Sequence, residues 1–280
     1  MRELSVDQIS AAVSQLCIQA NRQLPTDVRA GLWAALEAED SFTARDVLEQ
    51  LLENCAVAER DGMALCQDTG MAVVFCDLGQ EVHVTGGALE EAIQAGVRRG
   101  YREGYLRPSV VADPLQRVNT GDNTPAIVHY AIAPGDSLTL TVAPKGFGSE
   151  NGSALKMLTP SDGWEGVQQF VIETVARVGA SACPPLVVGV GLGGTSEKAV
   201  WLAKKALLRE LTAANPDPQY AAREAELLQA LNGLGIGPAG WGGHTTALAV
   251  HIEPFPTHIA GLPVAVNLSC HALRHASVTL

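Results

Sequence analysis

Three widely spaced cysteines are the residues of this chain best suited to chemistry. Cys66, Cys183 and Cys270 each stand in a short stretch bounded by glycine or proline. Protein thiolates are the usual ligands of iron–sulfur clusters, and three of them leave one iron of a four-iron cluster without a protein ligand. Such an iron can act as a Lewis acid toward a substrate oxygen. The spacing matches no local ferredoxin or zinc pattern, so the fold must bring three distant loops together.

The first of these cysteines opens a segment with four functional groups in a row. Cys66, Gln67, Asp68 and Thr69 offer a thiol, an amide, a carboxylate and a hydroxyl just before an expected strand. Loops at strand ends commonly carry such groups. The same letters, closed by Gly70, also suit an ordinary turn with a small buried cysteine. The residues alone leave both interpretations open.

Two glycine-rich segments could approach an anion. Segment 145–151, KGFGSEN, follows a strand pattern and is not a Walker loop; it suits either an anion cradle or an ordinary turn. Segment 189–195, GVGLGGT, imitates a dinucleotide fingerprint. Its acidic partner at the usual spacing would be Glu210, which falls inside an expected helix rather than at a strand end. We therefore expect the chain around Cys183 to support a cluster rather than a nucleotide.

A histidine and two arginines are candidates for handling a substrate. Arg107 precedes a proline, which favours an extended or turn backbone, and its guanidinium could pair with a carboxylate. Arg274 is either a second carboxylate clamp or part of a charged tail that faces solvent. His258 lies in a loop, where a histidine is usually solvated, and would relay protons only beside a carboxylate such as Asp68. The other cysteines look like core or surface residues rather than ligands: Cys17, Cys55 and Cys76.

Periodic patterns predict the elements that must position these residues. Apolar residues recur at helical spacing through most of residues 5–58, and β-rich runs bounded by turn residues follow. We expect the first two strands to form a hairpin or to lie side by side. A turn at 134–136 joins another pair. Further helices are expected at 88–105, 163–179, 196–213 and 218–234, and strands at 71–75, 81–84, 124–133, 137–144, 186–191, 247–253 and 263–270.

This order of elements predicts a mixed α/β protein of the α+β type. Strands occur both as neighbours and separated by helices, which indicates one or more mixed sheets packed with helices and a helical N-terminal cap. We expect a single domain over residues 1–280, with the cap at 1–60 as part of it.

Composition excludes several classes of protein. The 280 residues carry a net charge of −11, which argues against non-specific nucleic-acid binding. No apolar stretch is long enough to span a membrane, and the N-terminus has no secretory pattern. Six cysteines without tight spacing do not look like a disulfide scaffold, so a reducing cytoplasm is expected.

Taken together, several sequence motifs of this chain resemble those of a known protein family. They are CQDTG, LRPS followed by NTGDNTPA, PKGFGSEN, CPPLVVGVGLGG with its TSEKA continuation, HIAGLPVAVNLSCHA and the terminal HASVTL. In this order they resemble the N-terminal half of class I iron–sulfur fumarases. They equally resemble the alpha subunit of the related two-subunit fumarases and L-tartrate dehydratases. The resemblance runs across most of the chain.

The resemblance implies a function, a cofactor and a partner. It implies reversible hydration of fumarate to (S)-malate, with L-tartrate dehydration as the alternative. It implies a 4Fe–4S cluster and a beta subunit, in an alpha2beta2 enzyme, that supplies further cations and a base. The residues that the resemblance assigns are the cluster ligands Cys66, Cys183 and Cys270, the acid/base pair Asp68 and His258, and the substrate contacts Gln67, Arg107, Gly146, Phe147 and Gly148.

A non-catalytic iron–sulfur redox or sensor protein is the competing class. Electron transfer would favour four protein ligands, and the sequence offers no convincing fourth. A zinc site would favour two cysteines close together in the chain, which the sequence lacks.

Overall fold

The computed structural model describes residues 2–280, which divide into two compact units. Unit 1 comprises residues up to 24 together with 55–147 and 274–280. Unit 2 comprises 25–54 and 148–273. The mixed α/β class predicted from the sequence is confirmed, whereas the organisation as a single domain stays a prediction. No helix within residues 2–280 has the length and apolar character that crossing a membrane requires.

The helical N-terminus is confirmed. Three helices follow one another: α1 (Val6–Arg22), α2 (Thr26–Ala38) and α3 (Phe42–Asp61). Ser5 begins α1 with a capping box, in which its side chain accepts from the backbone N–H of Gln8 and the Gln8 side chain accepts from the backbone N–H of Ser5. Ser41 precedes α3 and accepts a hydrogen bond from the N–H of Ala44 at 3.5 Å, as expected for an N-cap.

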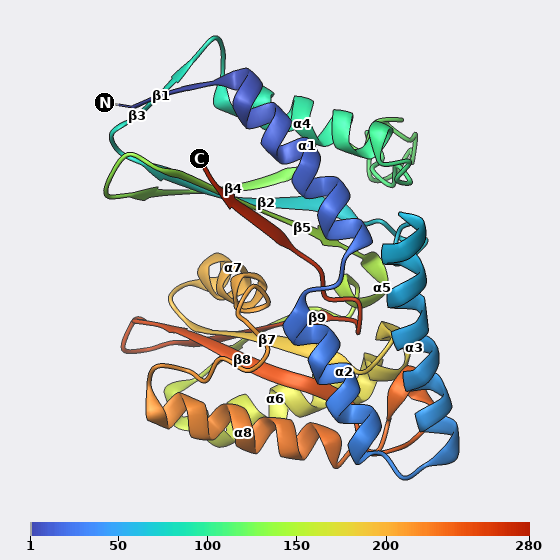
Figure 1. Cartoon of the computed structure of the whole chain (residues 1–280). Helices are drawn as coiled ribbons and strands as arrows, with labels where there is room; N and C mark the ends of the chain where they lie inside the picture. The colour runs from blue at the N-terminus through green and yellow to red at the C-terminus, as the bar shows by residue number, and fades with distance from the viewer. Residues whose placement is uncertain (1) are drawn as a thin grey trace. The chain divides into compact units, whose positions relative to one another are not determined.

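Unit 1 is built on a four-stranded sheet with the order β10-β5-β2-β4. The strand β2 runs parallel to β4 and antiparallel to β5, and helices α1 and α4 cover one face (Figure 1). Gly96 and Gly100 let α4 approach α1 closely, since a Cβ at either position would lie 2.7 Å from an α1 carbonyl oxygen. The elements are β2 (Met71–Gly79), α4 (Leu89–Glu103), β4 (Ile127–Ala133), β5 (Leu138–Lys145) and β10 (Ala276–Thr279).

Two predicted strand pairings are wrong. The strands on either side of the turn at 134–136, β4 and β5, do not pair with each other but flank β2. The predicted neighbour of β2, β3 (Val82–Thr85), instead pairs in parallel with β1 (Arg2–Ser5). The hairpin signal is local, whereas both observed pairings join segments far apart in the chain.

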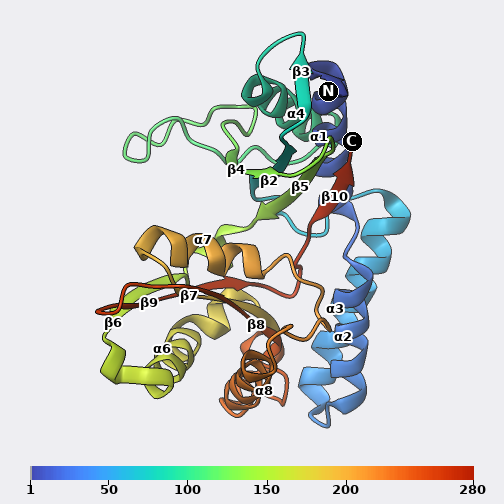
Figure 2. The same cartoon turned by 90° about the vertical axis from the view of Figure 1, so that its left-hand side faces the viewer.

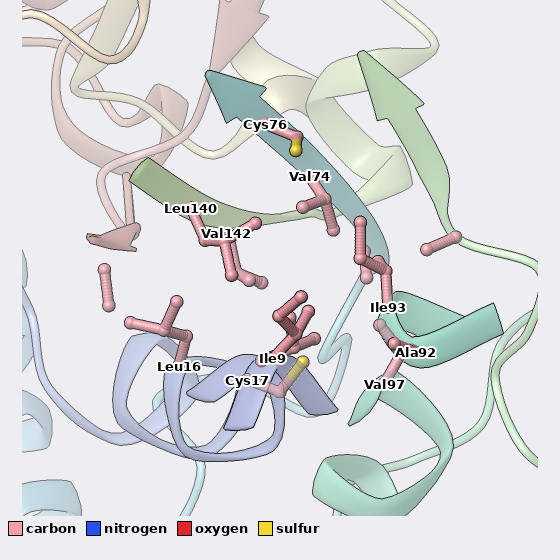
Figure 3. Packing of buried hydrophobic residues seen from close by; sticks show 14 of the residues in the cluster. Ile9, Leu16, Cys17, Val74, Cys76, Ala92, Ile93, Val97, Leu140 and Val142 are labelled. Atoms are coloured by element: carbon pink, nitrogen blue, oxygen red, sulfur yellow. The ribbon is translucent and has the colours of Figure 1, made fainter. Parts of the chain in front are cut away.

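The core of unit 1 lies between this sheet and its two helices. Figure 3 shows Ile9 and Leu16 of α1 packed with Val74 of β2, and Cys17 and Cys76 among these apolar side chains. The sheet is therefore held by one continuous apolar layer, in which both cysteines take part.

Unit 2 contains a second four-stranded sheet with the order β6-β9-β7-β8. Here β7 runs parallel to β8 and antiparallel to β9, with α7 on one face and α6 and α8 on the other (Figure 2). The strands are β6 (Ala154–Leu158), β7 (Leu186–Gly193), β8 (Ala247–Phe255) and β9 (Leu262–Ser269). The helices are α6 (Gly163–Val178), α7 (Ser196–Ala206) and α8 (Pro218–Asn232), and the short helices are α5 (Phe147–Glu150), η1 (Pro160–Asp162), η2 (Gly179–Ala182) and η3 (Pro238–Gly240).

The glycines that imitate a dinucleotide fingerprint have a packing role. Gly189 and Gly191 lie inside the fully buried strand β7. A Cβ at Gly189 would lie 2.1 Å from the carbonyl oxygen of Ala203, and one at Gly191 would lie 1.9 Å from that of Ala199. These glycines therefore allow α7 to pack directly on the strand, and the expectation against nucleotide binding agrees with this geometry.

Candidate active site

The loop that carries Cys66 is anchored by buried groups of unit 1. The hydroxyl of Thr69 donates to the carbonyl oxygen of Arg107 at 2.8 Å. Tyr101 donates to the carbonyl oxygen of Thr69 at 2.8 Å, and burial raises the pKa of Tyr101, which keeps its hydroxyl protonated as a donor. Asn123 holds the carbonyl oxygen of Gly70 at 3.1 Å. The segment is therefore a fixed loop, and its cysteine is half-buried rather than part of the core.

The carboxylate of Asp68 is held in one orientation by two backbone N–H groups. One oxygen accepts from Gly70 at 3.0 Å, and the other accepts from Phe147 at 2.8 Å. A Cβ at Gly146 would lie 3.2 Å from the second oxygen, so a side chain there would crowd the carboxylate. The turn at Gly146 and Phe147 thus binds an anion within the chain itself, the side chain of Asp68. Contact of Gly146, Phe147 and Gly148 with a substrate stays a prediction.

Arg274 lies against the same loop, so of its two predicted alternatives, a carboxylate clamp or part of a solvent-facing tail, the second is wrong. The residue is only 5% exposed, and its guanidinium donates to the backbone carbonyl oxygen of Asp68. Within residues 2–280 its Nε has no hydrogen-bond partner. Arg274 follows Cys270 by four positions in the chain. Its hydrogen bond therefore stabilises the backbone at Asp68.

The predicted substrate contacts Gln67 and Arg107 are both exposed. The thiol of Cys66 donates to the amide oxygen of Gln67 at 3.3 Å. Arg107 uses its carbonyl oxygen to hold Thr69, while its guanidinium pairs with no carboxylate among the residues that the structure describes. An exposed guanidinium without a carboxylate partner among the described residues can bind a carboxylate from solution.

The other two predicted ligands lie at one end of the sheet in unit 2. Cys183 is exposed just before β7, and Cys270 is half-buried directly after β9, which is antiparallel to β7. His271 joins the two loops, because its backbone N–H and its Nδ1 lie 3.2 Å and 3.1 Å from the carbonyl oxygen of Cys183. Cys183 adopts the left-handed conformation, with φ of 56°, which is uncommon for a residue with a side chain and is frequent at functional sites.

The remaining cysteines are poor ligands on physical grounds. Cys17 is fully buried, and desolvation raises its pKa to about 12. Burial, followed by the nearby Asp77 and Glu90, raises the pKa of Cys76 to about 12 as well. Cys55 is buried against Ala58 and Leu65. A cysteine binds a metal as a thiolate, and the cysteines that are not buried are the three that the sequence singled out: Cys66, Cys183 and Cys270.

The donor chemistry of these three cysteines fits an iron–sulfur cluster. Each is in no disulfide, and none is enclosed in the apolar core. Cys66 belongs to unit 1 and the other two to unit 2. Their joint coordination of a cluster stays a prediction.

His258 is placed at the opposite end of unit 2 from Cys183 and Cys270. It is exposed in the loop that leaves the end of β8 and enters the start of β9, and its Nδ1 accepts from the N–H of Ala260 at 3.1 Å. Figures 1 and 2 show this loop at one end of the sheet, away from the end at which β9 leads on toward β10. Its action as a proton relay stays a prediction.

A groove of about 360 Å³ adjoins His258 and was not expected from the sequence. Its walls include the side chains of Trp164 of α6, Tyr220 and Arg223 of α8, and the exposed Ile259. The Arg223 guanidinium lies 4.9 Å from the Trp164 ring centre and 5.3 Å from that of Tyr220. These residues are far apart in the chain, and no local sequence motif predicts that their side chains lie together.

A second group of possible metal ligands is occupied by structural hydrogen bonds. Glu39, Asp40 and His244 place their ligand atoms close together. The carboxylate of Glu39 accepts from the N–H of Ser41 at 3.1 Å and from that of His244 at 2.7 Å. The imidazole of His244 lies 2.9 Å from Asp40. The group fastens the turn between α2 and α3 and contains no thiol.

Comparison with known proteins gives a consistent result. Residues 10–279 match the family model described as fumarate hydratase (Fumerase). A protein of Methanocaldococcus jannaschii named "Putative L(+)-tartrate dehydratase subunit alpha" is 43% identical over 96% of both chains. The "L(+)-tartrate dehydratase subunit alpha" of Escherichia coli strain K12 is 31% identical, covering 99% of this chain and 92% of that protein.

Proposed function

The chain belongs to the fumarate hydratase (Fumerase) family of hydro-lyases, and from this membership we propose that it is the alpha subunit of an iron–sulfur-dependent enzyme. The proposed reaction is the reversible hydration of fumarate to (S)-malate. The observation that carries the proposal is the Cys66 loop, which fixes an accessible thiol and an oriented carboxylate and is bonded to the backbone of Arg107, whose guanidinium has no carboxylate partner among the described residues.

L-tartrate is the second candidate substrate. Both relatives reported above are named for tartrate dehydration. Tartrate and malate are 2-hydroxy dicarboxylates, so the same guanidinium and the same carboxylate can serve either reaction. The two substrates differ by one hydroxyl group, and buried polar groups discriminate such differences strongly.

The chemistry requires three roles. In the hydration direction, the hydroxide of water adds to one alkene carbon and a proton adds to the other. The 4Fe–4S cluster that we propose would be held by Cys66, Cys183 and Cys270 and would supply a Lewis acid for the oxygen that is gained or lost. Arg107 binds a substrate carboxylate, and Gln67 donates a hydrogen bond from its amide group. Asp68 and a histidine, His258, hold and move the proton.

The geometry of Asp68 suits proton transfer. Two backbone N–H groups fix the carboxylate and still leave it acceptor sites, because each carboxylate oxygen can accept more than one hydrogen bond. Arg274 fixes the backbone of the same residue. A carboxylate held in this way needs little reorganisation when a proton is transferred.

A beta subunit is the proposed partner, in an alpha2beta2 assembly. The relatives reported above are named as alpha subunits. A dianionic substrate needs cations at both carboxylates, and the described residues of this chain present only Arg107 next to the Cys66 loop without a partner.

A purely redox or sensor role is less well supported. A cluster that transfers electrons would favour a fourth protein ligand, and the three cysteines outside the proposed ligand set are buried: Cys17, Cys55 and Cys76. Two of them, Cys17 and Cys76, also have pKa values raised to about 12. Three accessible thiols suit a cluster with one open iron better.

The test is an anaerobic reconstitution of the alpha and beta subunits with iron and sulfide. We expect about four irons per alpha chain and hydration of fumarate. We further expect the Asp68→Asn variant to keep its iron and to lose activity by roughly 10²–10⁴-fold. Comparing kcat/KM for malate and L-tartrate assigns the substrate. A reconstituted enzyme that acts on neither dicarboxylate would refute the proposal.

A further inference from the structure

The segment between α4 and β4, residues 104–126, is a long loop with a fixed shape. It contains no helix and no regular strand. Loops of more than about 12–15 residues without such elements are uncommon, and they are usually functional or disordered. Here the chain doubles back as a hairpin, in which the N–H of Thr120 donates to the carbonyl oxygen of Val110 at 2.9 Å and that of Ala112 to Val118 at 2.7 Å. Figure 2 shows the segment extending away from the sheet of unit 1.

The base of this hairpin, residues 108–123, is tied to the loop that carries Cys66. We call these residues the finger. Asn123 is fully buried, and its side-chain oxygen accepts from the N–H of Ser109 at 2.7 Å, which joins the two ends of the finger. The amide group of the same side chain donates to the carbonyl oxygen of Gly70 at 3.1 Å. The finger is therefore an ordered projection rather than a disordered loop.

The tip of the finger presents apolar side chains and one cation. The carboxylate of Asp113 accepts from the N–H groups of Leu115 and Gln116 at 2.8 Å and 2.7 Å, which fixes the turn. Leu115 is 89% exposed, and Val118 is 62% exposed. Arg117 is exposed as well, and its guanidinium has no ion-pair partner within residues 2–280. A segment that is already ordered loses little entropy on binding, so this tip is suited to a recess in another protein.

Charge around the finger disfavours a second copy of this chain as the occupant. A pocket of about 340 Å³ adjoins the finger base, and its walls include Arg98 and Arg102 of α4. The carboxylate of Asp122, which also lines the pocket, is already paired with Arg98 at 2.7 Å. The tip of another copy would bring the guanidinium of Arg117 toward these like charges, which repel it. An apolar recess with acidic groups at its rim is the complement that the tip requires.

We propose that the finger docks the second, non-identical subunit of the enzyme by inserting Leu115 and Val118 into an apolar recess whose acidic rim pairs with Arg117. The inference rests on the proposed function, in which a beta subunit completes the site. Relatives of this chain are named as alpha subunits. A subunit that binds the finger is linked through Asn123 to the Cys66 loop, where the second substrate carboxylate lacks a cation.

The affinity between the two subunits is the first test. Leu115→Asp places a carboxylate in the proposed apolar recess, and Arg117→Glu reverses the charge at its rim. Each should raise the Kd of the reconstituted alpha chain for the matching beta subunit at least about tenfold, measured by calorimetry. Both side chains are exposed, so the melting temperature of the alpha chain should not change. Phe42→Asp is the matched control, because Phe42 is 86% exposed and lies outside the finger, and its Kd should stay within about twofold.

The outcomes separate this inference from the proposed function. If the wild-type chain binds the beta subunit and both finger variants bind it equally well, the inference is overturned and the proposed partner stands. The same holds if Phe42→Asp weakens binding as much as Leu115→Asp does. If the wild-type subunits do not associate at all, the proposed beta partner fails, and the inference fails with it.

Photo-cross-linking identifies the chain that contacts the finger without any measurement of activity. The photoreactive residue p-benzoylphenylalanine replaces Leu115 in the alpha–beta complex. Irradiation should give a species with the mass of one alpha and one beta chain, and peptide mapping should place the link near acidic residues of the beta chain. A species with the mass of two alpha chains would show that a second copy occupies the finger. That result, or a complex in which the beta chain is never cross-linked, overturns the inference.

Discussion

The thiols of this chain differ in how deeply they are buried. Cys17 and Cys76 are buried, and desolvation raises the pKa of each to about 12, so both stay protonated at neutral pH. Cys66, Cys183 and Cys270 are accessible. Cluster ligands must be thiolates, so accessibility separates the proposed ligands from the others.

This difference predicts the outcome of cysteine substitutions. Cys66→Ser, Cys183→Ser and Cys270→Ser should each abolish the broad visible absorption of the reconstituted protein. Cys17→Ala and Cys76→Ala should keep that absorption and lower only the melting temperature, because each leaves a small cavity in the core. Retention of the cluster in Cys270→Ser together with its loss in Cys76→Ala would reverse the assignment.

Arg274 is a positioning residue whose role can be separated from general stability. Arg274→Met removes the donor to the carbonyl oxygen of Asp68. We expect kcat to fall by at least about tenfold with iron retained, because the hydrogen bond of a charged donor contributes about 1.5–3 kcal/mol. Arg274→Lys should restore part of the activity.

The double variant tests whether Arg274 acts through Asp68. Asp68→Asn with Arg274→Met should be no slower than Asp68→Asn alone, since residues that work as one unit are not additive. Additive losses of activity would show that Arg274 has an independent role.

At the scale of single residues, the types of the candidate site residues could be predicted from the sequence. Not all of the contacts that these residues make could be predicted. The segment from Cys66 to Gly70 was correctly placed before a strand. Arg274 could equally have been a tail residue, because burial of a C-terminal arginine depends on partners some 200 positions away. The same holds for the bond between Asp68 and the N–H of Phe147, which joins two separate loops.

At the scale of elements, helices were predicted better than strand pairings. Helical periodicity is a local pattern, and the predicted helices are present, although α7 ends at Ala206 rather than near 213. The short strands β1, β6 and β10 were missed, since strands of four or five residues carry little signal of their own. The order of strands depends on contacts between distant segments, which no local pattern encodes.

The packing of α7 on β7 gives a prediction about stability. A Cβ at Gly191 would lie 1.9 Å from the carbonyl oxygen of Ala199, so Gly191→Ala must push the helix away from the strand. We expect a loss of about 1–3 kcal/mol in the free energy of unfolding, measured by denaturant titration. Gly261→Ala is the matched control, because its nearest neighbour lies at 4.0 Å. Equal stability of the two variants would contradict this account of the glycine.

At the scale of the whole molecule, charge limits what the chain can do alone. Its net charge is −11, so a dianionic substrate must be held by a few placed cations rather than by a general positive field. Next to the Cys66 loop, Arg274 uses its guanidinium on Asp68, and Lys145 is buried and donates to the carbonyl oxygen of Gly146. Arg107 alone remains to pair with a substrate carboxylate in the part of the chain that the structure describes.

The chain should therefore be catalytically incomplete without its partner. Purified alone and fully loaded with iron and sulfide, it should hydrate fumarate only weakly, because the second substrate carboxylate has no cation. Adding the matching beta subunit should restore turnover. The KM should also fall, because the second substrate carboxylate then has a cation to bind it. Iron content, measured before and after addition, separates missing cations from a missing cluster. Full activity of the isolated, iron-loaded chain would show that its own arginines and lysines complete the site.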